Sequence, residues 1–280
     1  MSVRYMGIDL AWGSRNTSAV VVLEGDPNRG ATLLAAAEAL GGDDEILAFV
    51  DRWDTGGGAL IALDAPTIVP NETGRRPCET ILSRCLAKAQ AGAHPANRTL
   101  LAGPDGTVRG ERIAAALAAR GFPQTPFLNT LAADKPPRAA FEVFPHPAHV
   151  ALFGLDKTLK YKAKPKRTVE TRYAEFRRYA AFLAALRHAD PPLFLPEDSD
   201  FQVGRDTTAL LPAALKRHED TLDALTCAYV ALYRHRWGDE RCSVVGDLEA
   251  GFIVTPVTDA MKTCFDASAA AAAADGAAGI

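Results

Sequence analysis

The sequence predicts an α/β fold in which a mixed β-sheet carries helices on both faces. Three observations lead to this prediction. Apolar residues near the start of the chain occur in runs typical of strands joined by short turns. Helix-length and strand-length patterns then alternate up to about residue 146, and mostly helical patterns follow. Strands and helices in this order typically fold as one sheet between layers of helices.

The first part of the chain favours a strand meander, then a helix and a further strand. We expect strands at 3–12, 18–25 and 59–67, and a helix at 43–53. The alanine-rich segment 31–40 is compatible with a strand or a helix, but the short connections on both sides favour a third strand.

The middle of the chain, 68–138, is less regular and rich in Pro, Gly and Arg, so it is expected to be an insertion-like section between two strands. Within and after it we expect helices at 78–92 and 110–122, loops at 94–106 and 126–137, and a strand at 138–146. Four of its arginines could give this section the charge to cap a site: Arg75, Arg76, Arg84 and Arg98.

The last part of the chain is mostly helical. Helices are expected at 167–190 and 218–237, a loop at 191–206 and a hairpin at 242–256. Residues 1–256 are therefore expected to form a single domain. The tail, 257–280, ends in a low-complexity alanine run, and we expect it to be disordered.

Composition narrows the class of protein. The chain has 280 residues, 48% of them hydrophobic, and a formal net charge of −3, so it can bury a sizeable core. It shows neither a secretory leader nor an apolar run of membrane-spanning length, and we expect no membrane partner. The five cysteines lack zinc-site spacing and are odd in number, which favours a reduced, cytoplasmic chain.

Because the pI of about 6.1 is mildly acidic, any contact with nucleic acid must come from a local basic patch. Two segments offer one, "KYKAKPKR" at 160–167 and "FRRYAAFLAALRH" at 176–188, although basic runs are often solvated surface. In the first segment, Tyr161 lies between Lys160 and Lys162 and could stack on a base.

Four acidic residues lie within runs that should be core, where an unpaired charge loses several kcal/mol of hydration and therefore needs a partner, a metal or a proton. They are Asp9, Asp64, Glu142 and Asp223. Each also has a plainer explanation: a turn cap at Asp9 or Asp64, or an ion pair of Glu142 with Arg138 or a lysine. Asp220 shares a helix face with Asp223, but it also lies in a first helical turn, where acids are favoured.

If the fold brings these carboxylates together, their repulsion requires a cation. Oxygen ligands with few imidazoles suit Mg²⁺ or Mn²⁺ rather than zinc. The acids therefore predict a divalent-cation site.

Four segments carry a family resemblance. "GIDLAWG", "ALDAPT", "FEVFPH" and "HEDTLDALTCAYVA", in this order, resemble the predicted nucleases of domain-of-unknown-function family 429, which has a ribonuclease H-like fold. The resemblance covers about Arg4 to Pro256. It implies a five-stranded mixed sheet with the first three strands antiparallel and the first strand central.

The resemblance also implies a site, in which acids on the first strand, the fourth strand and the last helix bind two divalent metals. By position these are Asp9, Asp64 and Asp223, with Asp9 as the bridging ligand. Glu142 and Asp220 are supporting or alternative ligands. Lys160, Lys162 or His218 would contact a phosphate, and His146 could do the same.

The implied activity is that of a metal-dependent hydrolase, a nuclease that cleaves DNA or RNA by a two-metal mechanism. Two alternatives remain. A phosphotransferase of the sugar-kinase and actin-like type begins with a similar strand, but such enzymes usually repeat the fold and no second strand of this kind is found. The other is a non-catalytic module that binds nucleic acid or protein on the same scaffold.

Overall fold

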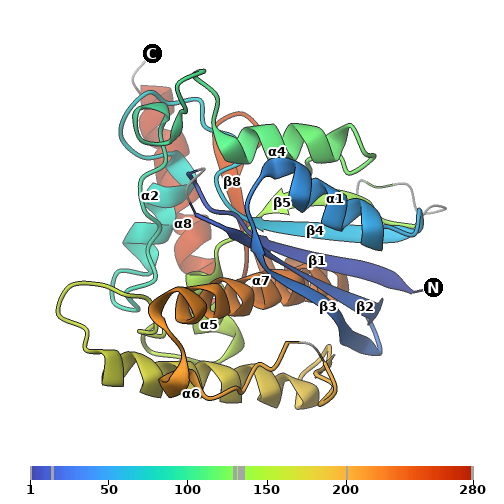
Figure 1. Ribbon diagram of the computed structural model, residues 1–280. Helices are drawn as coiled ribbons and strands as arrows, with labels where there is room; N and C mark the ends of the chain where they lie inside the picture. Colours follow the sequence, from blue (N-terminus) through green and yellow to red (C-terminus); the bar gives the residue numbers. More distant parts are fainter. Residues whose placement is uncertain (1, 14–15, 129–130, 132–135, 200, 279–280) are drawn as a thin grey trace.

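The computed structural model describes residues 2–13, 16–128, 131, 136–199 and 201–278. Its central feature is a six-stranded sheet with the strand order β5-β4-β1-β2-β3-β6 (Figure 1). The strands are β1 (Val3–Asp9), β2 (Ser18–Asp26), β3 (Gly30–Leu40), β4 (Gly58–Asp64), β5 (Arg138–Glu142) and β6 (Leu193–Phe194).

The sheet is mixed, as predicted. Strand β2 pairs antiparallel with both β1 and β3, while β4 is parallel to both β1 and β5. The first strand therefore lies inside the sheet. The expected strand count of five is wrong by one, because β6 adds a sixth strand parallel to β3. With only two residues, β6 carries no periodic pattern, so the segment 191–206 was expected to be a loop.

The ambiguous alanine-rich segment is a strand. Residues Gly30–Leu40 pair with β2 along most of their length. Ala31 and Leu33 are buried while Thr32 and Leu34 are exposed, which is the alternation of a strand with one covered face. Pairing with β2 thus outweighs the helix propensity of the alanines.

The chain also forms eight α-helices and three short 3₁₀ turns among the described residues. The helices are α1 (Asp43–Trp53), α2 (Pro77–Cys85), α3 (Arg98–Leu101), α4 (Arg109–Ala118), α5 (Pro145–Leu152), α6 (Val169–Ala185), α7 (Pro212–Trp237) and α8 (Asp259–Ala278). The 3₁₀ turns are Leu186–His188, Thr207–Ala209 and Gly238–Glu240. Helix α7 begins six residues before the expected start at His218, because Pro212 suits a first helical position.

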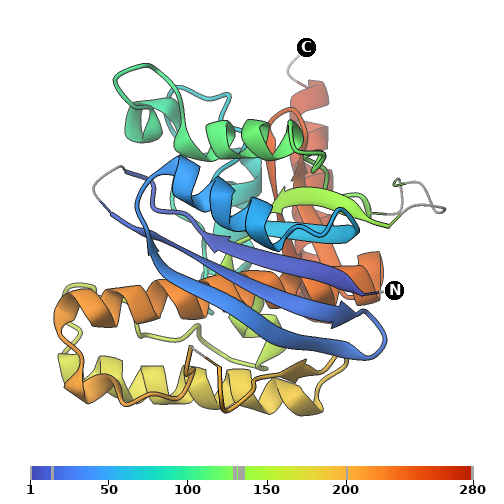
Figure 2. The same ribbon diagram turned by 45° about the vertical axis from the view of Figure 1, so that its right-hand side comes forward.

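Helices cover both faces of the sheet, as the sequence predicts. In β1, Tyr5 points into the core on the side of α7, whereas Met6 and Ile8 point to the side of α1 and α4. Figures 1 and 2 show α1 and α4 above the sheet and α7 beneath it, with α6 on the outer side of α7. Helix α7 is therefore enclosed between the sheet and α6, which explains why most of its residues are buried.

Helix α7 lies directly on β1 at Gly7. A Cβ atom at this position would lie 1.9 Å from the carbonyl oxygen of Ala224 and 2.3 Å from the backbone nitrogen of Ala228. Only a residue without a side chain allows this approach. The contact fixes the position of the first half of α7 along β1. It therefore also fixes the position of Asp223, which lies on this part of α7.

The section 68–138 is part of the core rather than an appended lid. In α4, Ile113 and Leu117 pack with Ile46 and Val50 of α1 in one cluster against the sheet. Helix α2 instead packs with α8 and with the hairpin of β7 (Cys242–Asp247) and β8 (Gly251–Pro256) in a third cluster. The expected hairpin at 242–256 is confirmed.

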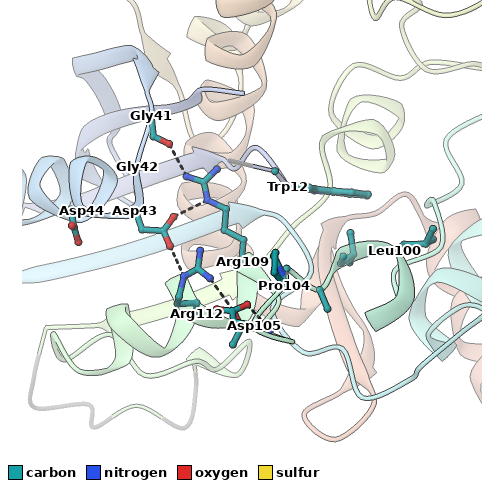
Figure 3. A pocket seen from close by; sticks show the side chains of 15 residues that line it. Trp12, Gly41, Gly42, Asp43, Asp44, Leu100, Pro104, Asp105, Arg109 and Arg112 are labelled. Atoms are coloured by element: carbon teal, nitrogen blue, oxygen red, sulfur yellow. Dashed lines mark hydrogen bonds and ion pairs between the residues drawn. The ribbon is translucent and has the colours of Figure 1, made fainter. Parts of the chain in front are cut away.

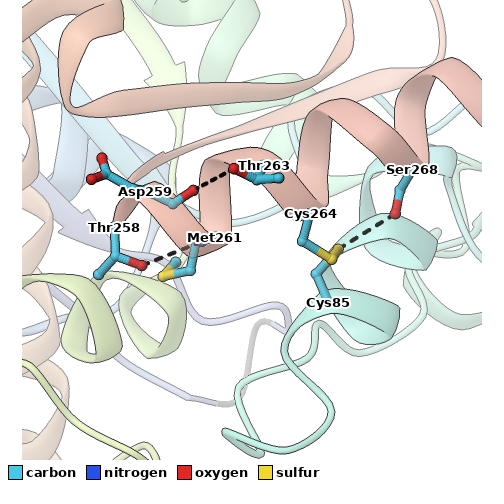
Figure 4. Close-up of a disulfide and its surroundings, with 7 residues drawn as sticks. All are labelled: Cys85, Thr258, Asp259, Met261, Thr263, Cys264 and Ser268. Carbon is cyan, nitrogen blue, oxygen red and sulfur yellow. Dashed lines mark hydrogen bonds between the residues drawn. A yellow bond between two sulfur atoms is a disulfide. The ribbon is translucent and has the colours of Figure 1, made fainter.

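The C-terminal tail corrects two expectations. The described residues after 258 form α8 instead of a disordered tail, with Met261 and Phe265 buried on one face. Cys264 on this helix forms a disulfide with Cys85 of α2 (Figure 4), so the expectation that all cysteines are reduced is wrong. The alanine-rich composition concealed the helix, although alanine is the strongest helix former and residues four apart share a face.

No helix in the described part of the chain combines the length and apolar character needed to cross a bilayer.

Candidate functional site

Two of the predicted acids lie side by side where neighbouring parallel strands end. The register of β1 and β4 pairs Asp9 with Asp64. Side chains two apart in a strand share a face, so Asp9 lies on the α7 side with Gly7 and Tyr5. The carboxyl ends of parallel strands are common ligand sites in α/β proteins. The sheet therefore places two carboxylates together at such an edge.

The third carboxylate comes from α7. Asp223 directly precedes Ala224, whose carbonyl oxygen borders Gly7 of β1. The side chain of Asp223 is fully buried. Asp9, Asp64 and Asp223 each offer one oxygen atom, and these atoms lie within 4.8 Å of one another. The structure thus brings together three of the predicted acids, hereafter the carboxylate cluster.

Asp223 is held by two hydroxyl donors on one oxygen and by an ion pair on the other. Its Oδ1 accepts hydrogen bonds from the Tyr161 hydroxyl at 2.6 Å and the Tyr179 hydroxyl at 3.1 Å, and its Oδ2 is 2.8 Å from Lys162 Nζ. The Tyr179 oxygen is also 2.8 Å from His149 Nε2. Burial acts against the charge of Asp223, but the Lys162 ammonium and these contacts outweigh it and lower the pKa of Asp223. Asp223 is therefore ionised.

The other two carboxylates are destabilised as anions. Burial, and then the charge of Asp64, raise the pKa of Asp9 well above its usual range. Burial raises the pKa of Asp64 to about 7, with Lys162 opposing the shift and Asp223 adding to it. Oδ2 of Asp9 is buried and has no hydrogen-bond partner among the described residues. An orphaned carboxylate oxygen beside two more carboxylates fits a divalent cation, so this cluster could hold a metal ion.

Glu142 does not join the cluster. Its Oε1 and Oε2 accept hydrogen bonds from Arg76 Nη2 at 2.6 Å and Nη1 at 2.9 Å, and the Thr67 N–H donates to Oε2 at 2.9 Å. The plainer explanation of Glu142, an ion pair, is thus correct in kind, but the partner is Arg76, because Arg138 pairs with Asp54 at 2.8 Å. Glu142 is thus a buried, neutralised carboxylate next to the cluster.

Asp220 stands at the edge of the cluster, in contact with Asp9 but outside the three acids whose oxygen atoms lie within 4.8 Å of one another. Lys216, one helical turn earlier, pairs with Asp220 and also with Glu219 at 3.1 Å. Such a pair is what a spacing of four residues produces on a helix. Asp220 therefore has its own cation already.

A cleft of about 620 Å³ opens above Asp9 and Asp64, hereafter the carboxylate cleft. Asp220 also lines it, as do four cationic side chains and two imidazoles: Lys162, Lys164, Lys216, Arg217, His94 and His146. The floor of the cleft is acidic and its wall is basic. This arrangement suits an anionic ligand bound beside a cation.

The predicted phosphate contacts divide. Lys162 lines the cleft, whereas Lys160 does not, and its backbone N–H donates to Glu175 Oε2 at 2.6 Å. His218 is buried against Phe201, and its Nδ1 accepts a hydrogen bond from Arg205 Nε at 3.0 Å. The predicted roles of Lys160 and His218 are therefore not supported by their positions, because α7 turns His218 into the core.

Two further expectations change. Tyr161 is fully buried and donates to Asp223, so it cannot stack on a base. Three of the four arginines expected to cap the site are engaged by other residues: Arg75 by Ser83, Arg76 by Glu142, and Arg98 by Glu111. They do not line the carboxylate cleft, whereas His94 of the same section does.

Sequence reasoning missed several residues of the site. Lys216 and Arg217 were overlooked because the helix was expected to start at His218; a start at Pro212 would have paired Lys216 with Asp220. Tyr179 carries no local signal, since it lies 44 residues from Asp223. Only packing of α6 on α7 shows that contact.

The fold and the site define a mixed α/β protein with three carboxylates gathered at the carboxyl ends of two parallel strands. The model of the family described as "Protein of unknown function (DUF429)" matches residues 7–250, and the chain belongs to this family. The match spans all three residues of the carboxylate cluster. No curated protein and no solved structure matches the chain.

Proposed function

We propose that the protein is a divalent-metal-dependent nuclease with a ribonuclease H-like fold, which hydrolyses phosphodiester bonds of nucleic acid. The observation that carries this proposal is the carboxylate cluster beneath a basic cleft wall. Acids alone would repel a nucleic acid, and lysines alone would bind it without chemistry. Both kinds of charge on one cleft favour hydrolysis at a phosphate.

The roles of the residues follow from their positions. Asp9, Asp64 and Asp223 would hold Mg²⁺ or Mn²⁺, and the bound ion would supply a lowered pKa for a water molecule and positive charge beside the leaving oxygen. Asp9, at the end of the inner strand β1, would be the ligand shared between two ions. Tyr161 and Tyr179 orient Asp223 so that its carboxylate keeps one position.

The basic wall would bind the substrate. Lys164 and Arg217 line the carboxylate cleft and have no acidic partner among the ion pairs of the described residues. Both are available to phosphates on either side of the reacting one. Lys162 and Lys216 are already paired with Asp223 and Asp220, so their charge mainly keeps the acids in place before a metal binds.

The test is cleavage of labelled single-stranded, duplex, hybrid and branched substrates with Mg²⁺ or Mn²⁺, with chelator as the blank. Asp9→Asn keeps the shape of the side chain and removes the ligand charge, so we expect a loss of roughly 100-fold or more. Asp51→Asn, an equally small change at an exposed carboxylate paired with Arg120, is expected to cleave as the wild type does.

Calorimetry with Mn²⁺ in the absence of nucleic acid gives a second readout. We expect uptake by the wild type and by Asp51→Asn, and none by Asp9→Asn or Asp64→Asn. Cleavage that persists in Asp9→Asn would refute the proposal. Failure of every substrate combined with a rise in melting temperature on adding ATP would favour the phosphotransferase instead. Binding of nucleic acid without turnover and without response to chelator would indicate a binding module.

A further inference from the structure

Trp12 is an exposed aromatic residue next to the carboxylate cluster. It lies three residues after Asp9, in the segment that leaves β1, and its side chain is 47% exposed. An indole has an apolar face and a polar N–H, which is why Trp is enriched at interfaces, and its face can stack on a base.

Trp12 also stands where cavities meet. It lines the carboxylate cleft and, on its other side, a groove of about 810 Å³, hereafter the Trp12 groove. Two smaller cavities border the same side chain, one between the end of β4 and α4 and the other between the end of β4 and the start of α2. A ligand that extends from the carboxylate cleft into the Trp12 groove must therefore pass the indole ring.

The Trp12 groove differs in chemistry from the carboxylate cleft. Besides Trp12 it is lined by apolar Leu100 and Pro104, and by three acids, Asp43, Asp44 and Asp105. Figure 3 shows Asp43 and its arginine partners at one end of the groove, and Leu100 at the other, on the side of Trp12.

The arginines of the groove are engaged by its own acid. Arg109 Nε donates to Asp43 Oδ1 at 2.7 Å and its Nη1 to the Ala11 carbonyl at 2.7 Å, while Arg112 Nε donates to Asp43 Oδ2 at 2.6 Å. Asp44 is exposed and adds negative charge. Phosphates are thus disfavoured in this groove, whereas the flat face and amino groups of a nucleobase suit an indole beside carboxylates.

We propose that Trp12 stacks on an unpaired base and selects single-stranded nucleic acid as the substrate. The backbone would follow the lysines and arginine of the carboxylate cleft, and a base next to the reacting phosphate would enter the Trp12 groove. In a duplex the faces of the bases are covered by their neighbours, so an indole can reach one only after unstacking, which costs a few kcal/mol. This inference rests on the proposed function for the placement of the strand in the cleft.

The test measures binding rather than cleavage. The probe is a fluorescein-labelled mixed-sequence DNA strand of about twelve nucleotides, alone or annealed to its complement. Asp9→Asn protein serves as the background, so that the strand stays intact. Trp12→Ala is expected to weaken single-strand binding on the order of tenfold, because stacking on one base contributes that much. Trp12→Phe is expected to retain most of the affinity.

Phe194→Ala is the matched control, because Phe194 is 44% exposed but lies on β6 at the far edge of the sheet. It is expected to bind as the background protein does. Quenching of tryptophan emission by the unlabelled strand gives an independent readout, and we expect it to diminish in Trp12→Phe. Circular dichroism and melting of Trp12→Ala should match the background, since an exposed side chain is removed.

The outcomes separate this inference from the proposed function. Duplex bound as tightly as single strand, an unchanged affinity in Trp12→Ala, or no binding of the strand would overturn the stacking role of Trp12. If Trp12→Ala cuts single-stranded substrate as well as the wild type does, hydrolysis stands and the inference fails. If no metal supports cleavage but single-strand binding depends on Trp12, the inference stands and the proposed hydrolysis fails.

Discussion

Lys162 shows how a single residue keeps the carboxylate cluster intact. Its Nζ lies 2.8 Å from Asp223 Oδ2, and its side chain is only 25% exposed. Burial opposes the charge of Lys162, but the carboxylates of Asp223, Asp9 and Asp64 outweigh it and raise its pKa. The ammonium therefore offsets the negative charge of the cluster. A divalent cation that binds Asp223 would have to compete with it.

Replacing Lys162 by Met should strengthen metal binding. Without the ammonium, a cation meets a more negative cluster and displaces no counter-charge, so we expect the affinity for Mn²⁺ to rise on the order of tenfold. Calorimetry at constant ionic strength measures this change. Lys164→Met is the matched control, because Lys164 lines the same cleft without an acidic partner, and its affinity should stay near that of the wild type. Unchanged or weaker Mn²⁺ binding in Lys162→Met would contradict the competition.

His218 is expected to make the fold less stable at low pH. The side chain is 1% exposed, and burial, followed by the charge of Arg205, lowers its pKa to about 3. In the unfolded chain a histidine titrates near pH 6.5. Between these values the unfolded chain binds a proton that the folded chain does not, so the free energy of unfolding falls as the pH decreases from about 6.5 towards 3.

Replacing His218 by Gln removes this titration. We expect the variant to lose less stability than the wild type between pH 7 and pH 4.5, by on the order of 2 kcal/mol. Urea unfolding at both pH values measures the difference. Some acid sensitivity should remain, because burial also lowers the pKa of His149 to about 4. Equal losses in the two proteins would mean that His218 is not held neutral.

At the scale of elements, the contact between β1 and α7 determines whether the site exists. Asp9 and Asp64 are aligned by strand pairing alone, but Asp223 reaches them only because Gly7 lets α7 lie on the strand. The glycine therefore has two effects, on packing and on the positions of the ligands.

Replacing Gly7 by Ala should damage both. The added methyl would collide with the backbone of α7, and we expect the free energy of unfolding to fall by roughly 3 kcal/mol. Because α7 must shift, Mn²⁺ affinity should fall as well. Gly204→Ala is the control, since nothing lies within 4 Å of a Cβ there. Chemical denaturation and calorimetry measure the two effects. A Gly7→Ala protein with wild-type stability would show that α7 does not rest on β1.

Local patterns in the sequence could be predicted, whereas contacts between residues far apart in the sequence could not. Strand alternation and the lone acids near strand ends are local signals, so the mixed sheet and the pairing of Asp9 with Asp64 were within reach. The roles of Glu142 and His218 could not be predicted in this way. The role of Glu142 depends on Arg76, 66 residues away, and the role of His218 depends on the orientation of α7. Residues of like sequence pattern thus receive opposite roles: Asp64 joins the cluster, and Glu142 is neutralised.

At the scale of the molecule, the chain has two parts with different tasks. The sheet with α1, α4, α6 and α7 positions the carboxylate cluster. Helix α2, the β7–β8 hairpin and α8 pack in a separate cluster, in which α2 and α8 lie to the left of the sheet in Figure 1. The parts meet where Arg76, at the start of α2, pairs with Glu142 of β5.

The disulfide between Cys85 and Cys264 should therefore affect stability more than the site. It joins residues 179 apart in the sequence, and a cross-link over such a distance restricts the unfolded chain. We expect Cys264→Ser to lower the free energy of unfolding by about 2–4 kcal/mol, and a thiol reductant to lower the melting temperature of the wild type but not of the variant. Because the carboxylate cluster lies on β1, β4 and α7, Mn²⁺ affinity should change less than twofold. If reductant leaves the melting temperature of the wild type unchanged, the cross-link does not stabilise the fold. A large loss of Mn²⁺ binding in Cys264→Ser would instead show that α8 supports the metal site through α2.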